Sequence, residues 1–354
     1  MRHIESLDGY RFLAAIIVLV GHFSNETGMF GQVLGAGAEQ IGVVMFFCLS
    51  GFFMGGIYFE KDFNPVELTR YILRRFGRVI PLFYFMLALG FLISLGNTGI
   101  PFFEIDDRAF LMGLALVDGP HLMWTIVTEC RFYLLFPLVW LAVSRKPGAG
   151  YPILLILIIG GQFISTNYTQ LPKEALFQYI QIFCAGILTA ILYRRTHLSG
   201  RNETRVKSVY LTDLPFVASA ISLLLFYPRV QQEIWGTTNV GNAYGNPYLV
   251  VVCCIFLFFT ILSPLAQKIL GNSFARFGGR VSFSIYLWHM PVIWLLLPLL
   301  DGFAREFQFL LILSSTMLAS SLSYTFIEIP GQNLFRRIER QIDERQFSRL
   351  SQDS

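Results

Sequence analysis

The chain has 354 residues and a net charge of +4, and 54% of its residues are hydrophobic while 14% are charged. Soluble domains carry about 25% charged residues, so this composition excludes a disordered or collagen-like chain and argues against a soluble globular protein. It indicates a polytopic membrane protein. The basic residues lie in short clusters between apolar segments, which is typical of topology determinants and not of a surface that binds nucleic acid.

Ten apolar segments are candidates for membrane helices, each of which needs about 20 mostly apolar residues. They cover residues 10–24, 41–59, 79–96, 123–143, 151–166, 176–193, 213–228, 248–265, 281–300 and 307–327. The first segment has no small-x-small cleavage site, so we expect it to remain as an uncleaved span. With both termini in the cytoplasm, most of the 27 Lys and Arg residues fall on the cytoplasmic side, as the positive-inside rule requires.

The sequence therefore predicts an all-α membrane helix bundle of about ten transmembrane helices with both termini cytoplasmic. We expect one membrane domain over residues 1–335 and a cytoplasmic tail over residues 336–354 that is partly helical and then disordered. The five cysteines lie inside apolar segments, which argues against a disulfide framework. No spacing typical of a metal site appears, so we expect no bound metal ion.

Ionisable side chains inside the first span are candidates for function, because each costs at least about 2.5–3.5 kcal/mol at the centre of a membrane helix. Arg11 and His22 are separated by eleven residues. At 100° per residue this spacing places both on one helix face, about 16 Å apart along the axis. The alternative is structural: Arg11 extends to the lipid headgroups and His22 lies at the membrane interface.

A cluster of arginines precedes the third span. Arg70, Arg74, Arg75 and Arg78 lie at helical spacing. Guanidinium groups bind phosphates well because each presents a fork of two parallel donors. The alternative is that these residues only mark the cytoplasmic side and contact anionic lipid.

The fourth span combines Trp124, Glu129, Arg131 and Tyr133. Because this span enters from the outer side, Glu129 reaches a depth similar to that of His22. A carboxylate beside a histidine fixes its tautomer and raises its basicity. The alternative is a structural Glu129–Arg131 pair, but residues i and i+2 do not face each other on a helix.

The ninth span begins with several polar side chains in VSFSIYLWHMP. Ser284, Tyr286 and His289 place hydroxyl groups and an imidazole in one apolar segment. The alternative is a buried histidine whose hydrogen bonds are satisfied by a neighbouring serine.

Six motifs in this order resemble the integral-membrane acyltransferase family 3, and together they span nearly the whole chain. The family's LDG-x-R start places Arg11 and His22, and its R-x-x-R-x-x-P pattern places Arg75 and Arg78. The matching segments are SLDGYRFLAAIIVLVGHF, IGVVMFFCLSGFFMG, RRFGRVIPLFY, MWTIVTECRFYLLFPL, VSFSIYLWHMP and FIEIPGQNLFRR. Phe283 stands where the family usually has tyrosine.

This resemblance implies a reaction and its partners. Family members transfer an acyl group, commonly acetyl, from cytoplasmic acyl-CoA to a hydroxyl of a cell-surface or lipid-linked glycan. The expected co-substrate is acyl-CoA, with no permanently bound cofactor. The expected partners are a carbohydrate or lipid-linked glycan acceptor and membrane lipid, with no nucleic acid. The expected location is the bacterial inner membrane, and the sequence indicates no oligomeric state.

The same resemblance suggests roles for the candidate residues. Arg75 and Arg78, with Arg74 and Arg11, would anchor the phosphates of acyl-CoA. His22 would act as general base on the acceptor hydroxyl, or alternatively would itself be acylated in a two-step route. Glu129 would orient and stabilise the imidazole of His22. The residues expected to position the substrate or the thioester are Trp124, Tyr133, Ser284, Tyr286 and His289.

Two other classes of protein remain as alternatives. A transporter or flippase of a lipid-linked glycan would use the buried His, Glu and Arg for proton coupling, but no inverted repeat is visible in the sequence. A catalytically inactive, receptor-like member would not need the retained polar residues.

Overall fold

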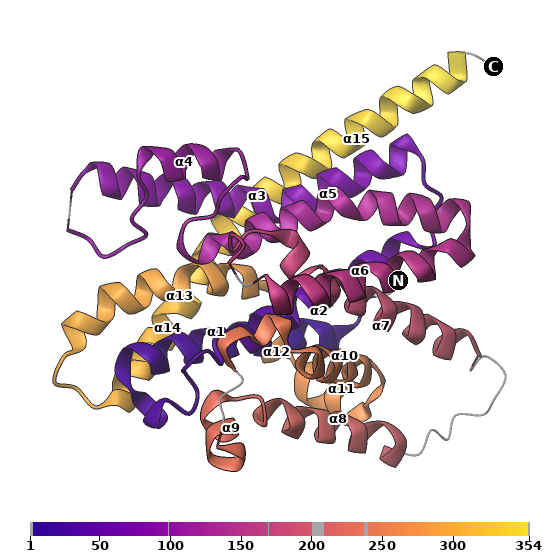
Figure 1. Ribbon diagram of the computed structural model, residues 1–354. Coiled ribbons are helices and arrows are strands. Elements are labelled where there is room, and N and C mark those ends of the chain that lie inside the picture. Colours follow the sequence, from indigo (N-terminus) through magenta and orange to yellow (C-terminus); the bar gives the residue numbers. More distant parts are fainter. Residues whose placement is uncertain (1–2, 98, 169, 200–208, 237–239, 353–354) are drawn as a thin grey trace.

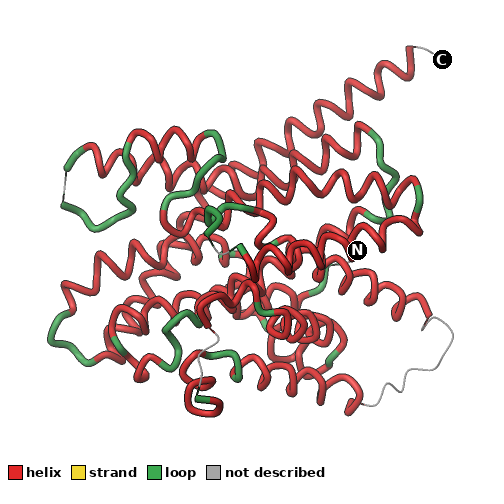
Figure 2. The backbone as a smooth tube through the Cα atoms, viewed as in Figure 1, coloured by secondary structure: helices red, strands yellow, loops and turns green. Residues whose placement is uncertain are grey.

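The computed structural model describes residues 3–97, 99–168, 170–199, 209–236 and 240–352. Within these ranges every regular element is a helix (Figure 2), which confirms the all-α prediction. The longer helices are α1 (Glu5–Thr27), α2 (Glu39–Tyr58), α3 (Pro65–Leu95), α5 (Trp124–Arg145), α6 (Pro147–Asn167), α7 (Ile180–Ser199), α8 (Val209–Leu224), α10 (Pro247–Leu262), α13 (Ser282–Leu296), α14 (Arg305–Ser323) and α15 (Ile329–Gln352). The shorter ones are η1 (Met29–Gln32), α4 (Asp107–Leu114), η2 (His121–Met123), η3 (Leu176–Gln178), α9 (Pro228–Trp235), η5 (Val240–Gly245), α11 (Pro264–Leu270), α12 (Ser273–Arg280), η6 (Leu297–Leu300) and η7 (Tyr324–Glu328).

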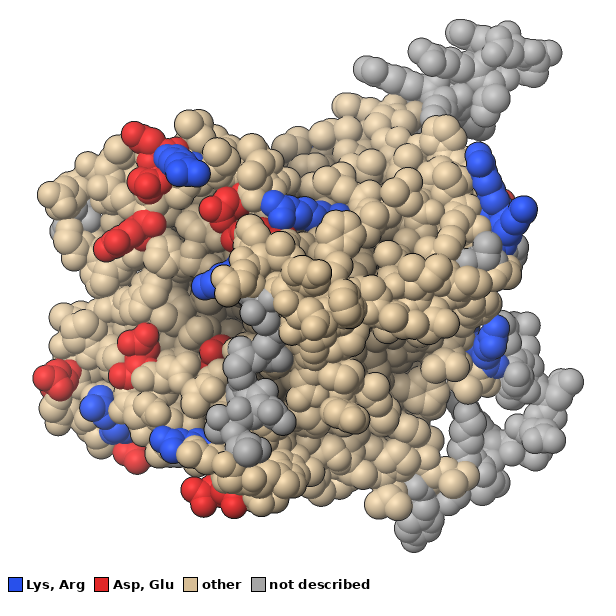
Figure 3. All heavy atoms as spheres, in the orientation of Figure 1, with Lys and Arg blue, Asp and Glu red and all other residues tan. Residues whose placement is uncertain are grey.

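Most of the long helices run roughly from left to right in Figure 1. The left-hand end carries α4 and the loop between α13 and α14, whereas α1 begins and α15 ends toward the right. On the face shown in Figure 3, Asp and Glu side chains gather at the left-hand end, and the area right of centre is uncharged up to the right-hand edge. An uncharged belt of this kind is suited to contact with the hydrocarbon of a bilayer.

Seven helices of the described residues are long and apolar enough to cross a membrane, or nine if each of two bent helix pairs forms one span. This finding supports an integral membrane protein. The count of ten spans and the cytoplasmic position of both termini stay predictions. The bent pairs are α8 with α9, at 84°, and α10 with α11, at 92°. In the second pair, Ser263 caps α11 and Pro264 follows it; a proline starts a new helix readily because it has no N–H to leave unpaired.

Helix α2 lies at the centre of the bundle, where glycines allow close packing. Gly51 of α2 lies against the carbonyl of Phe183 in α7, and Gly186 of α7 lies against the carbonyl of Cys48 in α2. On the other side, an added Cβ at Gly42 would stand 2.5 Å from the carbonyl oxygen of Ala14 in α1. Small residues let membrane helices approach each other in this way. These glycines therefore allow α1 and α7 to pack closely on either side of α2.

A π-helical turn, η7, joins α14 to α15, and the chain is helical without a break over Arg305–Ile342. Helix α15 then continues to Gln352. The sequence predicts disorder in the later part of this segment, and the structure shows helix there instead. The predicted division of the chain at residue 335 falls inside α15 and stays a prediction.

Candidate active site

Three cavities form a row through the bundle between helices α1, α2, α3, α5 and α13. We call them the arginine cavity, the narrow cavity and the histidine cavity. Arg75 and Arg78 lie in the walls of both the arginine and the narrow cavity. Val43 and Tyr286 lie in the walls of both the narrow and the histidine cavity. The narrow cavity therefore lies between the arginine cluster and the surroundings of His22.

The arginine cavity has a volume of about 570 Å³ and lies between α3 and α15. Its walls are formed by Ile57, Tyr58, Leu73, Arg74, Arg75, Gly77, Arg78, Gln332, Phe335, Arg336, Glu339 and Arg340. Asn64 starts α3 by accepting a hydrogen bond from the backbone N–H of Glu67 at 2.9 Å, and Pro65 follows as the first helical residue. This cap sets the helical register, and the arginines then follow at i, i+3 and i+4 spacing, as the sequence predicts.

The narrow cavity has a volume of only about 60 Å³ and contains Glu129 in its wall. The carboxylate of Glu129 accepts hydrogen bonds from the hydroxyl of Ser50 and from the hydroxyl of Tyr133, the latter at 2.5 Å. Arg11 also lines this cavity, with its guanidinium carbon 4.7 Å from the centre of the Phe53 ring. A cavity this small has room for a few water molecules, so an acyl chain would need side chains to move aside.

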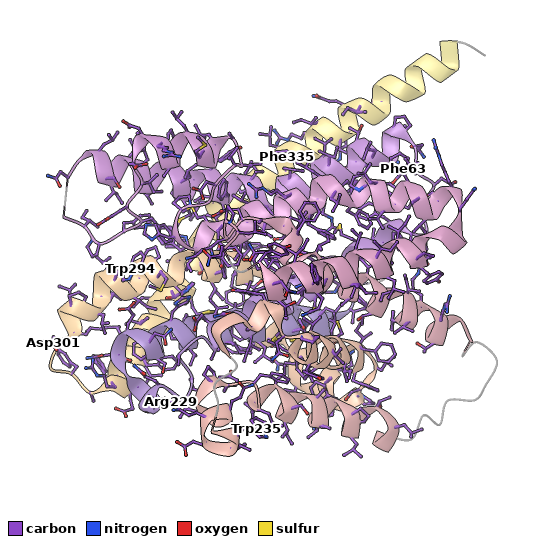
Figure 4. All side chains as sticks on the ribbon, viewed as in Figure 1. Phe63, Arg229, Trp235, Trp294, Asp301 and Phe335 are labelled. Carbon is purple, nitrogen blue, oxygen red and sulfur yellow. The ribbon has the colours of Figure 1, made fainter. Side chains whose placement is uncertain are left out.

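The histidine cavity has a volume of about 400 Å³ and is the more aromatic of the two wide cavities. It is lined by Val18, His22, Glu39, Gln40, Val43, His121, Leu122, Trp124, Lys173, Tyr179, Tyr244, Tyr286, Met290 and Trp294. In Figure 4, Trp294 of this cavity lies nearer the left-hand end of the molecule than Phe335 of the arginine cavity. The two wide cavities have no wall residue in common.

Glu39 is the carboxylate that shares this cavity with His22. An added Cβ on Gly21 would stand 2.9 Å from the Cβ of Glu39, so the glycine next to His22 brings the start of α2 against the end of α1. Asn25 donates a hydrogen bond to the Glu39 carboxylate at 3.3 Å. Glu39 was not predicted as a site residue, because it precedes the predicted span 41–59. The glycine next to His22, Gly21, was the feature of the sequence that could have indicated a close contact with another helix there.

The expected contact between Glu129 and His22 is not present. Glu129 lies in the wall of the narrow cavity, whereas His22 lies in the wall of the histidine cavity. No hydrogen bond or ion pair joins the two residues in the part of the chain that the structure describes. The carboxylate of Glu129 is held instead by the hydroxyls of Ser50 in α2 and Tyr133 in α5.

His289 lies behind His22, with 5.2 Å between the ring centres, and is fully buried. Its Nδ1–H donates to the backbone carbonyl of Ile285 at 3.2 Å, so Nε2 is left as an acceptor, and this atom has no hydrogen-bond partner in the described structure. His289 does not line any of the three cavities. It is placed to support the ring of His22 rather than to touch a substrate.

The other residues predicted to position the substrate, namely Trp124, Tyr133, Ser284 and Tyr286, do not all line the same cavity. Trp124 and Tyr286 line the histidine cavity, and Tyr286 accepts a hydrogen bond from Thr125 at 3.0 Å. Tyr133 lies beside Glu129. Ser284 is fully buried and donates to the carboxylate of Glu328, so the structure places it away from the three cavities.

Arg131 has partners of its own, as the i, i+2 argument predicts. Its guanidinium donates to the backbone carbonyl of Val117, at 2.6 Å, and to that of Glu174. It therefore ties together the loops that precede α5 and α7, beside the histidine cavity that contains Lys173.

The chemistry that this row allows is acid–base or nucleophilic chemistry at His22 together with anion binding at the arginine cluster. Among the residues that the structure describes, no three His, Cys, Asp or Glu side chains gather so that they could hold a metal ion.

Comparison with known proteins adds independent information. Residues 4–325 match the model of a protein family described as an acyltransferase domain. The chain is 26% identical over 387 aligned residues to the peptidoglycan O-acetyltransferase OatA of Listeria monocytogenes, covering 93% of this chain and 56% of that protein. It is 24% identical over 360 residues to the O-acetyltransferase OatA of Staphylococcus aureus, covering 93% and 57%. The chain thus spans just over half the length of these relatives. No solved structure matches it.

Proposed function

Since this chain belongs to the acyltransferase-domain family that its residues 4–325 match, we propose that it is a membrane O-acetyltransferase. It transfers an acetyl group from acetyl-CoA, bound from the cytoplasmic side of a bacterial inner membrane, to a hydroxyl of a cell-surface or lipid-linked glycan. One of the similar proteins is named for peptidoglycan, so peptidoglycan is the first acceptor to test.

The donor end of the site is the arginine cavity. Coenzyme A carries a diphosphate and a 3′-phosphate, and bidentate guanidinium groups match such anions. Arg75 and Arg78 form the boundary to the narrow cavity, so phosphates bound there leave the pantetheine arm directed toward Glu129. Arg74 lines the same cavity but pairs with Glu339, and Arg11, also predicted for the phosphates, lies in the wall of the narrow cavity instead.

The acceptor end is the histidine cavity. Trp124, Tyr179, Tyr244 and Trp294 give it aromatic walls, and the apolar faces of sugar rings pack well on such walls. His22 accepts the proton of the acceptor hydroxyl as its oxygen attacks the thioester carbonyl. The C–S bond breaks, the C–O ester bond forms, and the thiolate leaves and is protonated. Glu39 stabilises the imidazolium that forms on His22.

A two-step route uses the same residues in another order. In that route His22 attacks the thioester first, and the acceptor hydroxyl then takes the acetyl group from the acyl-imidazole. Both routes need His22 beside the passage from the arginine cavity. The observation that carries the proposal is the row of three cavities that joins the arginine cluster to His22.

The test compares membranes that contain equal amounts of the wild-type chain or of His22→Ala. Radiolabelled acetyl-CoA is added, and label is followed into the glycan fraction, peptidoglycan included. We expect label to fall at least 100-fold in His22→Ala, since a general base contributes about 10²–10⁴-fold. Equal label in both samples would remove His22 from the mechanism. Transport of a lipid-linked glycan without any label would favour the transporter alternative.

A further inference from the structure

The last helix, α15, lies along α3, beyond the segment that matches the family (Figure 1). Three contacts, four residues apart on α15, hold it there. Gly331 lies against Pro81. An added Cβ on Gly77 would stand 2.7 Å from the Cβ of Phe335. Glu339 accepts from Arg74, with Nε–Oε1 at 3.0 Å and Nη2–Oε1 at 2.5 Å.

These contacts fix the rotation of α15 about its axis. Residues 331, 335 and 339 form the stripe that packs on α3. The next stripe, 100° around the helix, consists of Gln332, Arg336 and Arg340, and all three residues line the arginine cavity. The same docking therefore aims two further guanidinium groups into the cavity, although they lie some 260 residues after the arginines of α3.

The charge of the arginine cavity is strongly unbalanced. Five arginines line it, and Glu339 is the one carboxylate in its described wall. Glu339 pairs with Arg74. Within the described part of the chain, no carboxylate forms an ion pair with Arg75, Arg78, Arg336 or Arg340. The side chain of Arg75 is also buried, with 9% of its surface exposed, and its Nε has no hydrogen-bond partner in the described structure.

Water solvates the exposed Arg336 and Arg340, but the buried Arg75 gains most from a bound anion, because a charge removed from water is costly without a partner. The walls suggest which anion. Arg75 lies over the ring of Tyr58, 5.5 Å from its centre, and Ile57 and Phe335 add apolar surface. A volume of about 570 Å³ is in the usual range for a small-molecule site. Tyr58 itself is buried, with 2% of its surface exposed, so the apolar surface open to a ligand is that of Ile57 and Phe335. Apolar surface beside several arginines suits a nucleotide, which carries both a base and phosphates.

We infer that α15 completes the nucleotide site of the acyl donor. Arg336 and Arg340 bind the phosphates of a thioester donor that carries a phosphorylated nucleotide, and the part-buried side chains of Ile57 and Phe335 offer apolar surface to its base. This inference rests on the proposed function and extends the donor site to a helix that begins after residues 4–325, the part that the family model matches. A lipid headgroup also carries a phosphate. The two acyl chains of a lipid, however, would not fit into the narrow cavity of about 60 Å³ that lies next to the arginine cavity on the side of His22.

The test uses the full-length protein, purified in detergent, and adenosine 3′,5′-bisphosphate as the probe. The test variant is Arg336→Ala/Arg340→Ala. The control is Arg337→Ala on the same helix, which removes an exposed arginine that does not line the cavity. We expect the Kd of the probe to rise at least tenfold, about 1.4 kcal/mol, in the double variant and to stay unchanged in the control. We also expect KM for acetyl-CoA to rise while kcat is retained.

Three results would overturn the inference. The first is absence of probe binding by the wild-type protein. The second is equal affinity in the double variant and the wild type, or an equal loss in Arg337→Ala. The third is a double variant that keeps its affinity for the probe but loses binding to vesicles of phosphatidylglycerol relative to phosphatidylcholine, because the ligand of α15 would then be lipid.

Two further measurements distinguish a failure of this inference from misfolding of the variant and from a failure of the proposed function. Arg336→Lys/Arg340→Lys keeps the charge and is expected to recover part of the affinity, which a misfolded protein would not do. If the wild type binds the probe through α15 but transfers no acetyl group, the proposed function fails while the nucleotide site stands.

Discussion

Glu39 packs against Gly21, and this contact brings its carboxylate into the same cavity as the imidazole of the next residue, His22. Two helix ends meet there: the last turns of α1 and the first turn of α2. The geometry makes Glu39, rather than Glu129, the carboxylate best placed to stabilise positive charge on His22.

Replacing Glu39 with glutamine keeps the size of the side chain and removes its charge. We expect Glu39→Gln to lower kcat by about 10- to 100-fold, less than the loss of the general base itself. KM for acetyl-CoA should not change, because Glu39 does not line the arginine cavity. Steady-state kinetics measure both values. Glu26→Gln, an exposed carboxylate at the same end of α1, is the control, and an equal effect in both variants would remove the assigned role.

Val43 lies where the narrow cavity meets the histidine cavity. A phenylalanine at this position fills the passage, so Val43→Phe is expected to abolish acetyl transfer while the affinity for adenosine 3′,5′-bisphosphate stays within about twofold. Overpacking costs about 1–3 kcal/mol of stability, which a thermal unfolding curve reports separately. Val43→Ala, which leaves the passage open, is the matched control. Transfer at wild-type rate in Val43→Phe would show that the acyl group takes another path.

The hydroxyl of Tyr133 is one of two groups that donate to the carboxylate of Glu129. Its removal in Tyr133→Phe is expected to cost about 1.5–3 kcal/mol of stability, as for hydrogen bonds to charged groups. Tyr84→Phe is the control, because the hydroxyl of Tyr84 donates to a neutral carbonyl, that of Leu114, at 2.8 Å. The expected loss there is only about 0.5–1.5 kcal/mol. The free energies of unfolding of the two variants are compared, and a loss for Tyr133→Phe no larger than that for Tyr84→Phe would contradict the prediction.

Glu174 lies in the loop before α7, outside the membrane helices. Burial raises the pKa of its carboxyl from the ordinary value of 4.5, and a hydrogen bond with Asp118 raises this pKa further, while Arg131 opposes the shift. A raised pKa means that the folded state favours the protonated form, so this carboxyl stabilises the fold at low pH. That contribution is lost as the pH rises from 4.5 through the raised pKa.

The measurement that checks this is the difference in Tm between Glu174→Gln and the wild type from pH 4 to pH 8. We expect the variant to become more stable relative to the wild type as the pH rises, because glutamine does not ionise. Glu233→Gln, which changes an exposed carboxylate on α9, provides the control. A difference that is constant with pH would contradict the prediction.

Much of the fold could be predicted from the sequence because it follows from local patterns. Each of the ten apolar segments overlaps helix in the structure, although two of them run into the bends after α8 and α10. Of the four arginines of α3, Arg74, Arg75 and Arg78 line one cavity, whereas Arg70 pairs with Glu67. The partner Ser50 of Glu129 could not be predicted, because it comes from another helix, α2. The places of Glu39 and of Arg336 and Arg340 depend on contacts between distant segments, at Gly21 and at Gly77.

The central claim is that the acetyl group passes through the protein from the arginine cavity to the histidine cavity. The direct test uses the purified protein in sealed proteoliposomes, with labelled acetyl-CoA outside and a soluble glycan acceptor enclosed inside. We predict labelled acceptor in the enclosed compartment with the wild-type protein, and none with His22→Ala or Val43→Phe. Labelled acceptor that forms only when donor and acceptor share one compartment would contradict transfer through the row of cavities.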